Sequence, residues 1–376
     1  MKALVKFELY KIFRQKSIYI AFVLMLLLVA MSLGGQYGGS SNSYYHSWEG
    51  ELTQQKIESS DAAWQAIYNK YEGKEIEWSQ EDRVKAGVLE SISNLHYKET
   101  QRSGQVEALK EYLYTADKNG EHGYGLRKAG LQLSMLESFK INQFYYSRGA
   151  GEIIDFMNTF GLVLSGAMLL VGLASIFSNE YATGMDQFLL SSKLGRKRLV
   201  SAKIISSMLY LVFIVVVWES FNIIYQINKY GGGGWHSPMQ KLFKYSYSPY
   251  ALDLITYGFV QIGMHLLGAI GLVAVILLVS AWCRHTLLSF LISGTIFAVP
   301  IVIMNILKID ISWLTHILQF SITKIMAVEV LFMNFSTINL FGLPVLYPLV
   351  AIAVMIATIV LSLSLLYGTM RRKEVM

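Results

Sequence analysis

Residues 178–203 read SNEYATGMDQFLLSSKLGRKRLVSAK and connect two long hydrophobic runs. We call this segment the polar loop. Its second half is rich in lysine and arginine, and basic residues beside a membrane span mark the cytoplasmic side. The apolar triplet at residues 188–190 lies among charges, which predicts a short helix on the membrane surface with one face available to a protein partner. The residues that we expect to take part in this docking are Glu180, Gly184, Asp186, Phe188, Leu189, Leu190, Arg196 and Arg198.

The polar loop resembles the coupling-helix loop between the second and third spans of ABC-2 type transporter permeases, the membrane subunits of a class of ATP-driven exporters. The residues that carry the resemblance are Glu180, Gly184, the Leu-Leu-Ser segment, Arg196, Arg198 and Lys203. The family often has a proline after Leu-Leu-Ser, where this chain has Lys193, so the turn is expected to be looser. The resemblance implies a cytoplasmic ABC ATPase subunit docked on the polar loop, and a homodimer or a second permease subunit in the membrane.

The composition independently indicates a membrane protein. The chain has 376 residues, of which 53% are hydrophobic and only 15% are charged, and its mean hydropathy is +0.41. These values are typical of a polytopic membrane protein surrounded by lipid. The net charge of +6 does not indicate nucleic-acid binding, because the basic residues lie mainly beside hydrophobic runs. The single cysteine, Cys283, excludes a disulfide within the chain and a cysteine-based metal motif.

The N-terminal segment is predicted to lie along the membrane before the chain enters it. Residues 1–16 place apolar side chains largely on one face and basic ones around the rest, which predicts an amphipathic helix in the inner interface. The run at residues 18–33 follows, and at about 1.5 Å per residue it spans the bilayer if Gly34 and Gly35 are included. A cleaved signal peptide is the alternative, disfavoured because the basic region is long and no small-residue cleavage site follows.

Residues 36–151 form a predicted separate domain, because most of the acidic residues lie here and the basic ones are not clustered. After a linker rich in Gly, Ser and Tyr, apolar residues recur at helical spacing, which predicts three or four amphipathic helices. We expect this insert to be extracytoplasmic, and a long translocated loop is not subject to the charge rule. The apolar positions are Val84, Val88, Ile92, Leu95, Leu126, Leu133, Leu136, Phe139, Ile141 and Phe144.

Four further hydrophobic runs predict spans two to five, at residues 156–177, 204–225, 254–282 and 287–307. Span two, at residues 156–177, contains small residues such as Gly161, Ser165, Gly166 and Gly172, which favour close helix contact. The candidate residues of a substrate path are Glu219, Asn222 and His265. A carboxylate within a span is costly unless it is neutral, paired or facing water, so Glu219 either lines a path or has a structural partner. For His265 the alternative is a hydrogen-bonded core histidine.

Residues 311–341 decide the topology, because they are hydrophobic but interrupted by polar and charged side chains. If this segment crossed the membrane, the basic residues 371–373 would lie outside, against the positive-inside tendency. Two short re-entrant or interfacial helices fit better. With a last span at residues 347–367, the prediction is an all-α protein of the cell membrane with six spans and both termini cytoplasmic. We also expect a bacterial origin. Residues 152–376 then form the transmembrane domain, and residues 1–35 the interfacial helix and first span.

The sequence lacks the motifs of an enzyme. It has no GxxxxGK[ST] phosphate-binding loop, so we expect ATP to be used by the partner subunit and this chain to bind no cofactor or metal itself. It also lacks HExxH and GxSxG motifs, which disfavours a membrane enzyme. A third possibility is a sensor whose extracytoplasmic domain binds a ligand without transport. We favour an exporter of an amphipathic substrate, such as a peptide, an antibiotic or a lipid-linked molecule.

Overall fold

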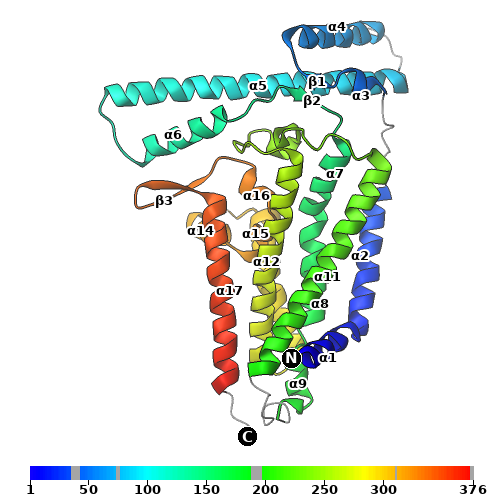
Figure 1. The fold of residues 1–376 in the computed structure, drawn as a ribbon, viewed down its shortest axis with the longest axis vertical. Helices are drawn as coiled ribbons and strands as arrows, with labels where there is room; N and C mark the ends of the chain where they lie inside the picture. Colours follow the sequence, from blue (N-terminus) through cyan, green and yellow to red (C-terminus); the bar gives the residue numbers. More distant parts are fainter. Residues whose placement is uncertain (35–42, 73–76, 188–196, 310, 373–376) are drawn as a thin grey trace.

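The computed structural model describes residues 1–34, 43–72, 77–187, 197–309 and 311–372. An upright bundle of helices is crossed at one end by α5 (Gln80–Lys118) (Figure 1). At the opposite end lie α1 (Lys2–Phe13) and the last turn of α17 (Tyr347–Arg372). We refer to these as the α5 end and the α1 end of the bundle. Both described termini of the chain therefore lie on the same side of the bundle.

Six helices within the described residues are long and apolar enough to cross a membrane, which confirms the all-α polytopic prediction. The spanning elements are α2 (Lys16–Gly34), α7 (Arg148–Phe156) with the π turn η1 (Met157–Gly161), α8 (Leu162–Leu173) and α9 (Ser178–Ala182), then α11 (Lys197–Tyr230), α12 (Leu254–Trp282), α13 (Thr286–Ile301) with the π turn η4 (Val302–Ile306), and α17. The third span begins seven residues earlier than predicted, because helical backbone continues beyond the hydrophobic run into the basic part of the polar loop.

The bundle core lies around α12, which packs against α8, α11, α13 and α17. The glycines predicted to allow close contact do so: a Cβ atom on Gly172 would lie 2.6 Å from Cε1 of Tyr210, and one on Gly166 would overlap the Phe297 ring. In contrast, α2 and α13 expose rows of leucine and other apolar side chains. In a membrane protein such faces contact lipid, so the helices near the centre carry the buried polar groups.

The insert is a helical layer at the α5 end, as predicted, with α3 (Ser43–Ser47), α4 (Gln54–Tyr71) and α6 (Tyr124–Glu137) arranged along α5. Val88, Ile92 and Leu95 of α5 form its apolar core together with Ile141 and Phe144. The last two positions were predicted to continue a helix, which is wrong. Phe144 lies in β2 (Gln143–Phe144), paired antiparallel with β1 (Gly50–Glu51), so these apolar side chains are buried by a strand pair instead.

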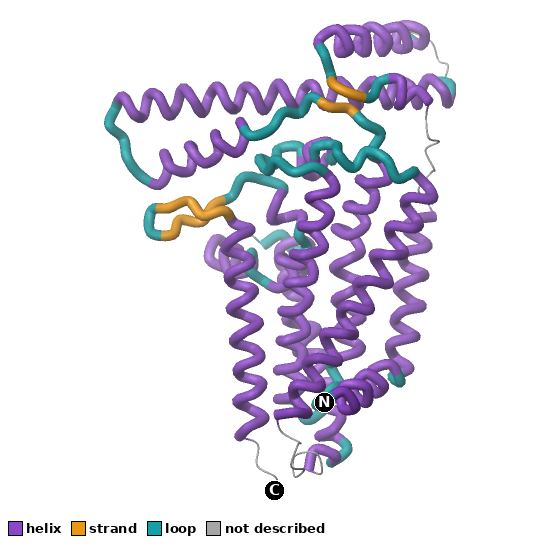
Figure 2. Tube along the Cα trace, in the orientation of Figure 1, coloured by secondary structure: helices purple, strands orange, loops and turns teal. Residues whose placement is uncertain are grey.

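Residues 311–341 do not form one long spanning helix, in agreement with the prediction, but their structure is richer than two short helices. Three short helices occur, α14 (Ser312–Leu318), α15 (Ile322–Met326) and α16 (Glu329–Phe332). They are followed by an unpredicted hairpin of β3 (Thr337–Leu340) and β4 (Leu343–Leu346), visible in Figure 2. Its turn at Phe341 and Gly342 has positive φ at both residues, which matches the right-handed twist of paired strands.

Candidate functional site

The polar loop begins as a well-defined structure at the α1 end of the bundle. After α8 the chain turns into α9, and the Oγ atom of Ser280 on α12 accepts hydrogen bonds from the backbone N–H groups of Phe177 and Ser178. Helix α9 ends at Ala182 with Thr183 as its C-cap, and Gly184 follows with a φ of +70°, the left-handed conformation that commonly terminates a helix. Backbone bonding therefore fixes where the polar loop leaves the bundle.

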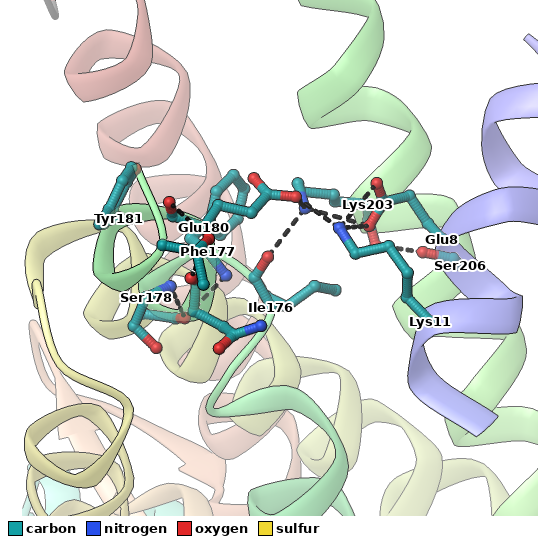
Figure 3. Close-up of polar contacts among 12 residues, drawn as sticks. Glu8, Lys11, Ile176, Phe177, Ser178, Glu180, Tyr181, Lys203 and Ser206 are labelled. Carbon is teal, nitrogen blue, oxygen red and sulfur yellow. Dashed lines mark hydrogen bonds and ion pairs between the residues drawn. The ribbon is translucent and has the colours of Figure 1, made fainter. Parts of the chain in front are cut away.

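A buried cluster of four charged side chains lies beside α9 (Figure 3). We call it the ion cluster, and its members are Glu8 and Lys11 of α1, Glu180 of α9 and Lys203 of α11. The Nζ atom of Lys203 lies 2.7 Å from Oε1 of Glu180 and 3.0 Å from Oε2 of Glu8. Lys11 also pairs with both carboxylates. Two ammonium groups and two carboxylates therefore compensate one another.

The surroundings of the ion cluster explain why it needs this balance. The side chain of Lys203 is completely buried, and that of Glu8 is 2% exposed. An isolated charge in such a place is strongly destabilising, and it is tolerated only when it is paired and hydrogen-bonded. Lys203 satisfies the remaining donor capacity with the carbonyl oxygen of Ile176, at 2.8 Å, and its ammonium group lies over the Phe177 ring. Each element that meets here is thereby held by at least one buried ion pair.

Lys11 is the member of the ion cluster closest to solvent. Burial by itself lowers the pKa of its ammonium group, but the carboxylates of Glu180 and Glu8 outweigh this effect, so the pKa is raised. The group therefore stays charged near neutral pH. A groove of about 520 Å³ opens beside it, bordered by α1 and by the entry to the polar loop. The ion cluster therefore borders this groove, whose lining includes Glu8, Lys11 and Glu180.

The residues predicted for docking fall into three groups. Glu180 is buried in the ion cluster, so its carboxylate faces the protein interior. Gly184 and Arg198 are exposed and Asp186 is half-buried, and the backbone is helical again at residues 185–187. Phe188, Leu189, Leu190 and Arg196 lie outside the described residues. The structure therefore brings Glu180 and Lys203 together but leaves the docking role of the apolar triplet a prediction.

Glu219 and Asn222 lie one turn apart on α11, as predicted, with Nδ2 of Asn222 3.3 Å from Oε2 of Glu219. Asn222 is buried, and its Nδ2 atom also donates to the carbonyl oxygen of Ile153 at 2.9 Å. Glu219 is half-buried at the wall of an apolar groove of about 200 Å³ between α7, α11 and α12. Among the described residues the carboxylate of Glu219 has no ion-pair partner. The rest of the lining is apolar apart from Gln261. A single carboxylate in such a groove can bind a cationic group attached to an apolar body.

His265 occupies a different environment. It is buried on α12, where Nε2 lies 2.9 Å from Oγ of Ser165 and Nδ1 lies 3.1 Å from the carbonyl oxygen of Met326. Both ring nitrogens therefore have partners from other elements, and His265 is not among the residues that line the groove at Glu219. This geometry corresponds to the alternative of a hydrogen-bonded core histidine, which links α8, α12 and α15.

Sequence reasoning missed Glu8 and Lys11, and it used Lys203 as a residue of the coupling-loop resemblance without predicting a buried ion pair for it. One signal was present, because Glu8 is the first acidic residue of the chain and the next is Glu49. On a helix, Glu8 also follows Leu4 and precedes Ile12 at four-residue spacing, which places it on the buried face of α1. An acidic side chain on the apolar face of an amphipathic helix predicts a buried basic partner.

The comparisons with known proteins give one result. Residues 2–327 match the model of a protein family described as ABC-2 family transporter protein. No curated protein and no solved structure matches the chain.

Proposed function

This chain belongs to the ABC-2 family of transporter proteins, and from this premise we propose that it is the membrane subunit of an ATP-driven exporter. The family is one of transmembrane transporter subunits that pair with an ABC ATPase. In our proposal ATP is bound and hydrolysed only by that partner, and the spans move an amphipathic molecule outward. The active unit is a homodimer of this chain or a pair with a second permease.

The observation that carries the proposal is the ion cluster. Free energy from ATP hydrolysis in a separate subunit can reach the spans only through mechanical contact. Glu180 stands at the entry to the polar loop, Lys203 in the third span and Glu8 in the interfacial helix, and these three side chains are paired in a buried site. A displacement of the loop would therefore be transmitted to α11 and α1 together, since separating the pairs would leave buried charges uncompensated.

The orientation follows from the distribution of basic residues. Lysines of α1, together with Arg371 and Arg372 at the end of α17, lie at the α1 end of the bundle. Because basic residues flanking spans favour the cytoplasmic side, we assign this end to the cytoplasm and the insert to the outside. The ATPase then docks at the α1 end, and the outward-moving substrate leaves near the α5 end.

The exporter proposal predicts a stable complex with an ATPase. Purification of the tagged chain in a mild non-ionic detergent is expected to retain a polypeptide that carries a GxxxxGK[ST] motif, identified by mass spectrometry, and the preparation should hydrolyse ATP. Parallel purification of an unrelated polytopic membrane protein with the same tag is the control. Recovery of a kinase, or of the chain without any nucleotide-binding partner, would instead support the sensor alternative.

The groove at Glu219 predicts preference for a cationic amphiphile. Rhodamine 6G, a fluorescent cation with an apolar body, is expected to bind the purified protein. Glu219→Gln removes the negative charge that attracts the cation and should weaken this binding about tenfold, which corresponds to about 1.4 kcal/mol. Fluorescence anisotropy measures the affinity. Glu90→Gln, on the exposed surface of α5, is the matched control and should bind like the unmodified protein. Equal affinities for all three proteins would remove Glu219 from the substrate path.

A further inference from the structure

A third cavity, larger than the two grooves described above, lies between the insert and the membrane-spanning bundle. Its volume is about 710 Å³, and α5 forms one wall. The opposite wall is the segment between α11 and α12, which contains the short helices η2 (Met239–Lys241) and η3 (Phe243–Tyr245). This segment runs below α5 at the α5 end of the bundle (Figure 1). The cavity therefore lies at the opposite end of the bundle from the ion cluster, and it shares no lining residue with the groove at Glu219.

The lining of this cavity is basic. It includes Lys98 and Arg102 of α5 and Lys241 and Lys244 of the opposite wall, and no acidic residue is among the described lining residues. The lining charges differ in their partners: Arg102 is paired with Glu99, and Lys244 is paired with acidic residues of the bundle. Lys98 and Lys241 are the two lining lysines whose described contacts include no ion pair.

Lys98 and Lys241 have donor capacity left for a ligand. Nζ of Lys98 donates to the carbonyl oxygens of Gln240 and Lys241, at 2.8 and 3.3 Å, and Nζ of Lys241 donates to the carbonyl oxygen of Tyr145. An ammonium group has three donors, so these contacts leave at least one on each lysine. Burial is the largest influence on both groups and lowers the pKa of each to about 8, although Glu49 partly offsets the effect on Lys241. A bound anion would compensate both charges.

The rim of the same cavity is aromatic. Phe243 is 93% exposed, and Tyr247 and Tyr97 are also exposed. Three exposed aromatic side chains on one rim form a contiguous apolar patch, and such patches mark interaction or ligand-binding sites. The aromatic rim and the two lysines are parts of one cavity lining. The combination fits a molecule that carries an anionic group at one end and an apolar chain at the other.

We propose that this cavity binds an amphipathic anion, whose phosphate or carboxylate group lies between Lys98 and Lys241 and whose apolar part lies against Phe243 and Tyr247. This proposal is argued from the cavity lining alone, so its test is independent of whether the chain is an exporter. Charge-assisted hydrogen bonds from two ammonium groups select the anion, because a neutral or zwitterionic head group gains less from them. The alternative is that the two lysines only tie the insert to the bundle through backbone carbonyls.

Native mass spectrometry of the full-length protein in a neutral maltoside detergent tests the site. Dioctanoyl phosphatidylglycerol should bind in a 1:1 adduct about tenfold more tightly than dioctanoyl phosphatidylcholine, because both carry an anionic phosphate but the choline ammonium of the latter would be repelled by the two lysine ammonium groups. The Lys98→Gln, Lys241→Gln double variant should lose this preference, and Lys98→Arg, Lys241→Arg should keep most of it. The matched control is Lys85→Gln, Lys118→Gln, two lysines of α5 outside the cavity lining, which should behave like the unmodified protein.

Two further probes identify the source of the ligand. Decyl phosphate binding as tightly as the phospholipid would assign the site to free amphipathic anions, and selective binding of phosphatidylglycerol would assign it to membrane lipid. Inorganic phosphate bound as tightly as either would overturn the amphipathic assignment. The proposal also fails if the unmodified protein does not prefer the anionic lipid, or if the glutamine variant keeps that preference. A thermal unfolding scan of each variant shows that the protein compared is folded.

Discussion

Substitution of Lys203 by methionine is expected to reduce the free energy of unfolding by about 3–5 kcal/mol, because removal of one partner from a buried ion pair leaves an uncompensated charge. The ion cluster would retain the carboxylates of Glu8 and Glu180 and the single ammonium group of Lys11, a net charge of −1. Methionine is chosen because it fills a similar volume without a charge. The measurement is thermal unfolding of the purified protein in detergent, followed by intrinsic fluorescence.

Two further variants make this result specific to the ion cluster. Lys197→Met removes a lysine from the exposed first turn of the same helix and should change the unfolding temperature little. Addition of Glu8→Gln to Lys203→Met restores neutrality, since only Lys11 and Glu180 remain charged, and should recover much of the lost stability. If Lys203→Met and Lys197→Met unfold at the same temperature, the four residues do not form a buried network.

The Phe188→Asp, Leu189→Asp double variant is expected to insert and fold but to lose its ATPase partner. Full burial of one Leu or Phe side chain contributes roughly 1.5–3 kcal/mol, so charging two of them removes most of the affinity of a short docking helix. Every 1.4 kcal/mol is about tenfold in affinity, which makes the expected loss larger than a hundredfold. Retention of the ATPase on the tagged chain, together with ATP-dependent export, is the measurement.

A conservative variant separates docking from folding. Phe188→Leu, Leu189→Met keeps both side chains apolar and should retain the ATPase. If the aspartate variant disappears from the membrane while the conservative variant is present, the triplet packs against its own spans and the docking role is wrong. A well-expressed aspartate variant that keeps both the partner and export would contradict the docking role in the same way.

The two predictions test different parts of one connection. The triplet at residues 188–190 is proposed to receive force from the ATPase, and the ion cluster is proposed to pass it to α1 and α11. A folded variant of the triplet that no longer retains the ATPase would therefore have its defect in docking. A variant of the ion cluster that keeps the ATPase but loses export would place the defect in transmission. The destabilisation measured in detergent shows how much the ion cluster contributes to the stability of that junction.

The sequence by itself determined the spans and the insert, because both depend on local composition. A run of about 20 apolar residues requires a hydrogen-bonded helix in lipid, wherever the rest of the chain lies. The helical periodicity of Val88, Ile92 and Leu95 likewise predicted the α5 helix and its buried face. The family resemblance also rested on a contiguous segment, the polar loop, and the family match agrees with it.

Only the tertiary structure decided which polar side chains meet. Glu180 and Lys203 belong to one loop, but Glu8 lies 195 positions before Lys203 in the chain. No local pattern states that α1 crosses the start of α11. The same holds for the partners of His265 and for the cavity between α5 and the segment after α11. In the bilayer any apolar face can contact lipid. Hydrophobicity therefore determines that a helix crosses the membrane, but it does not determine which other helices it packs against. Close packing at glycines and the pairing of buried charges select the neighbours, and both are properties of the assembled bundle.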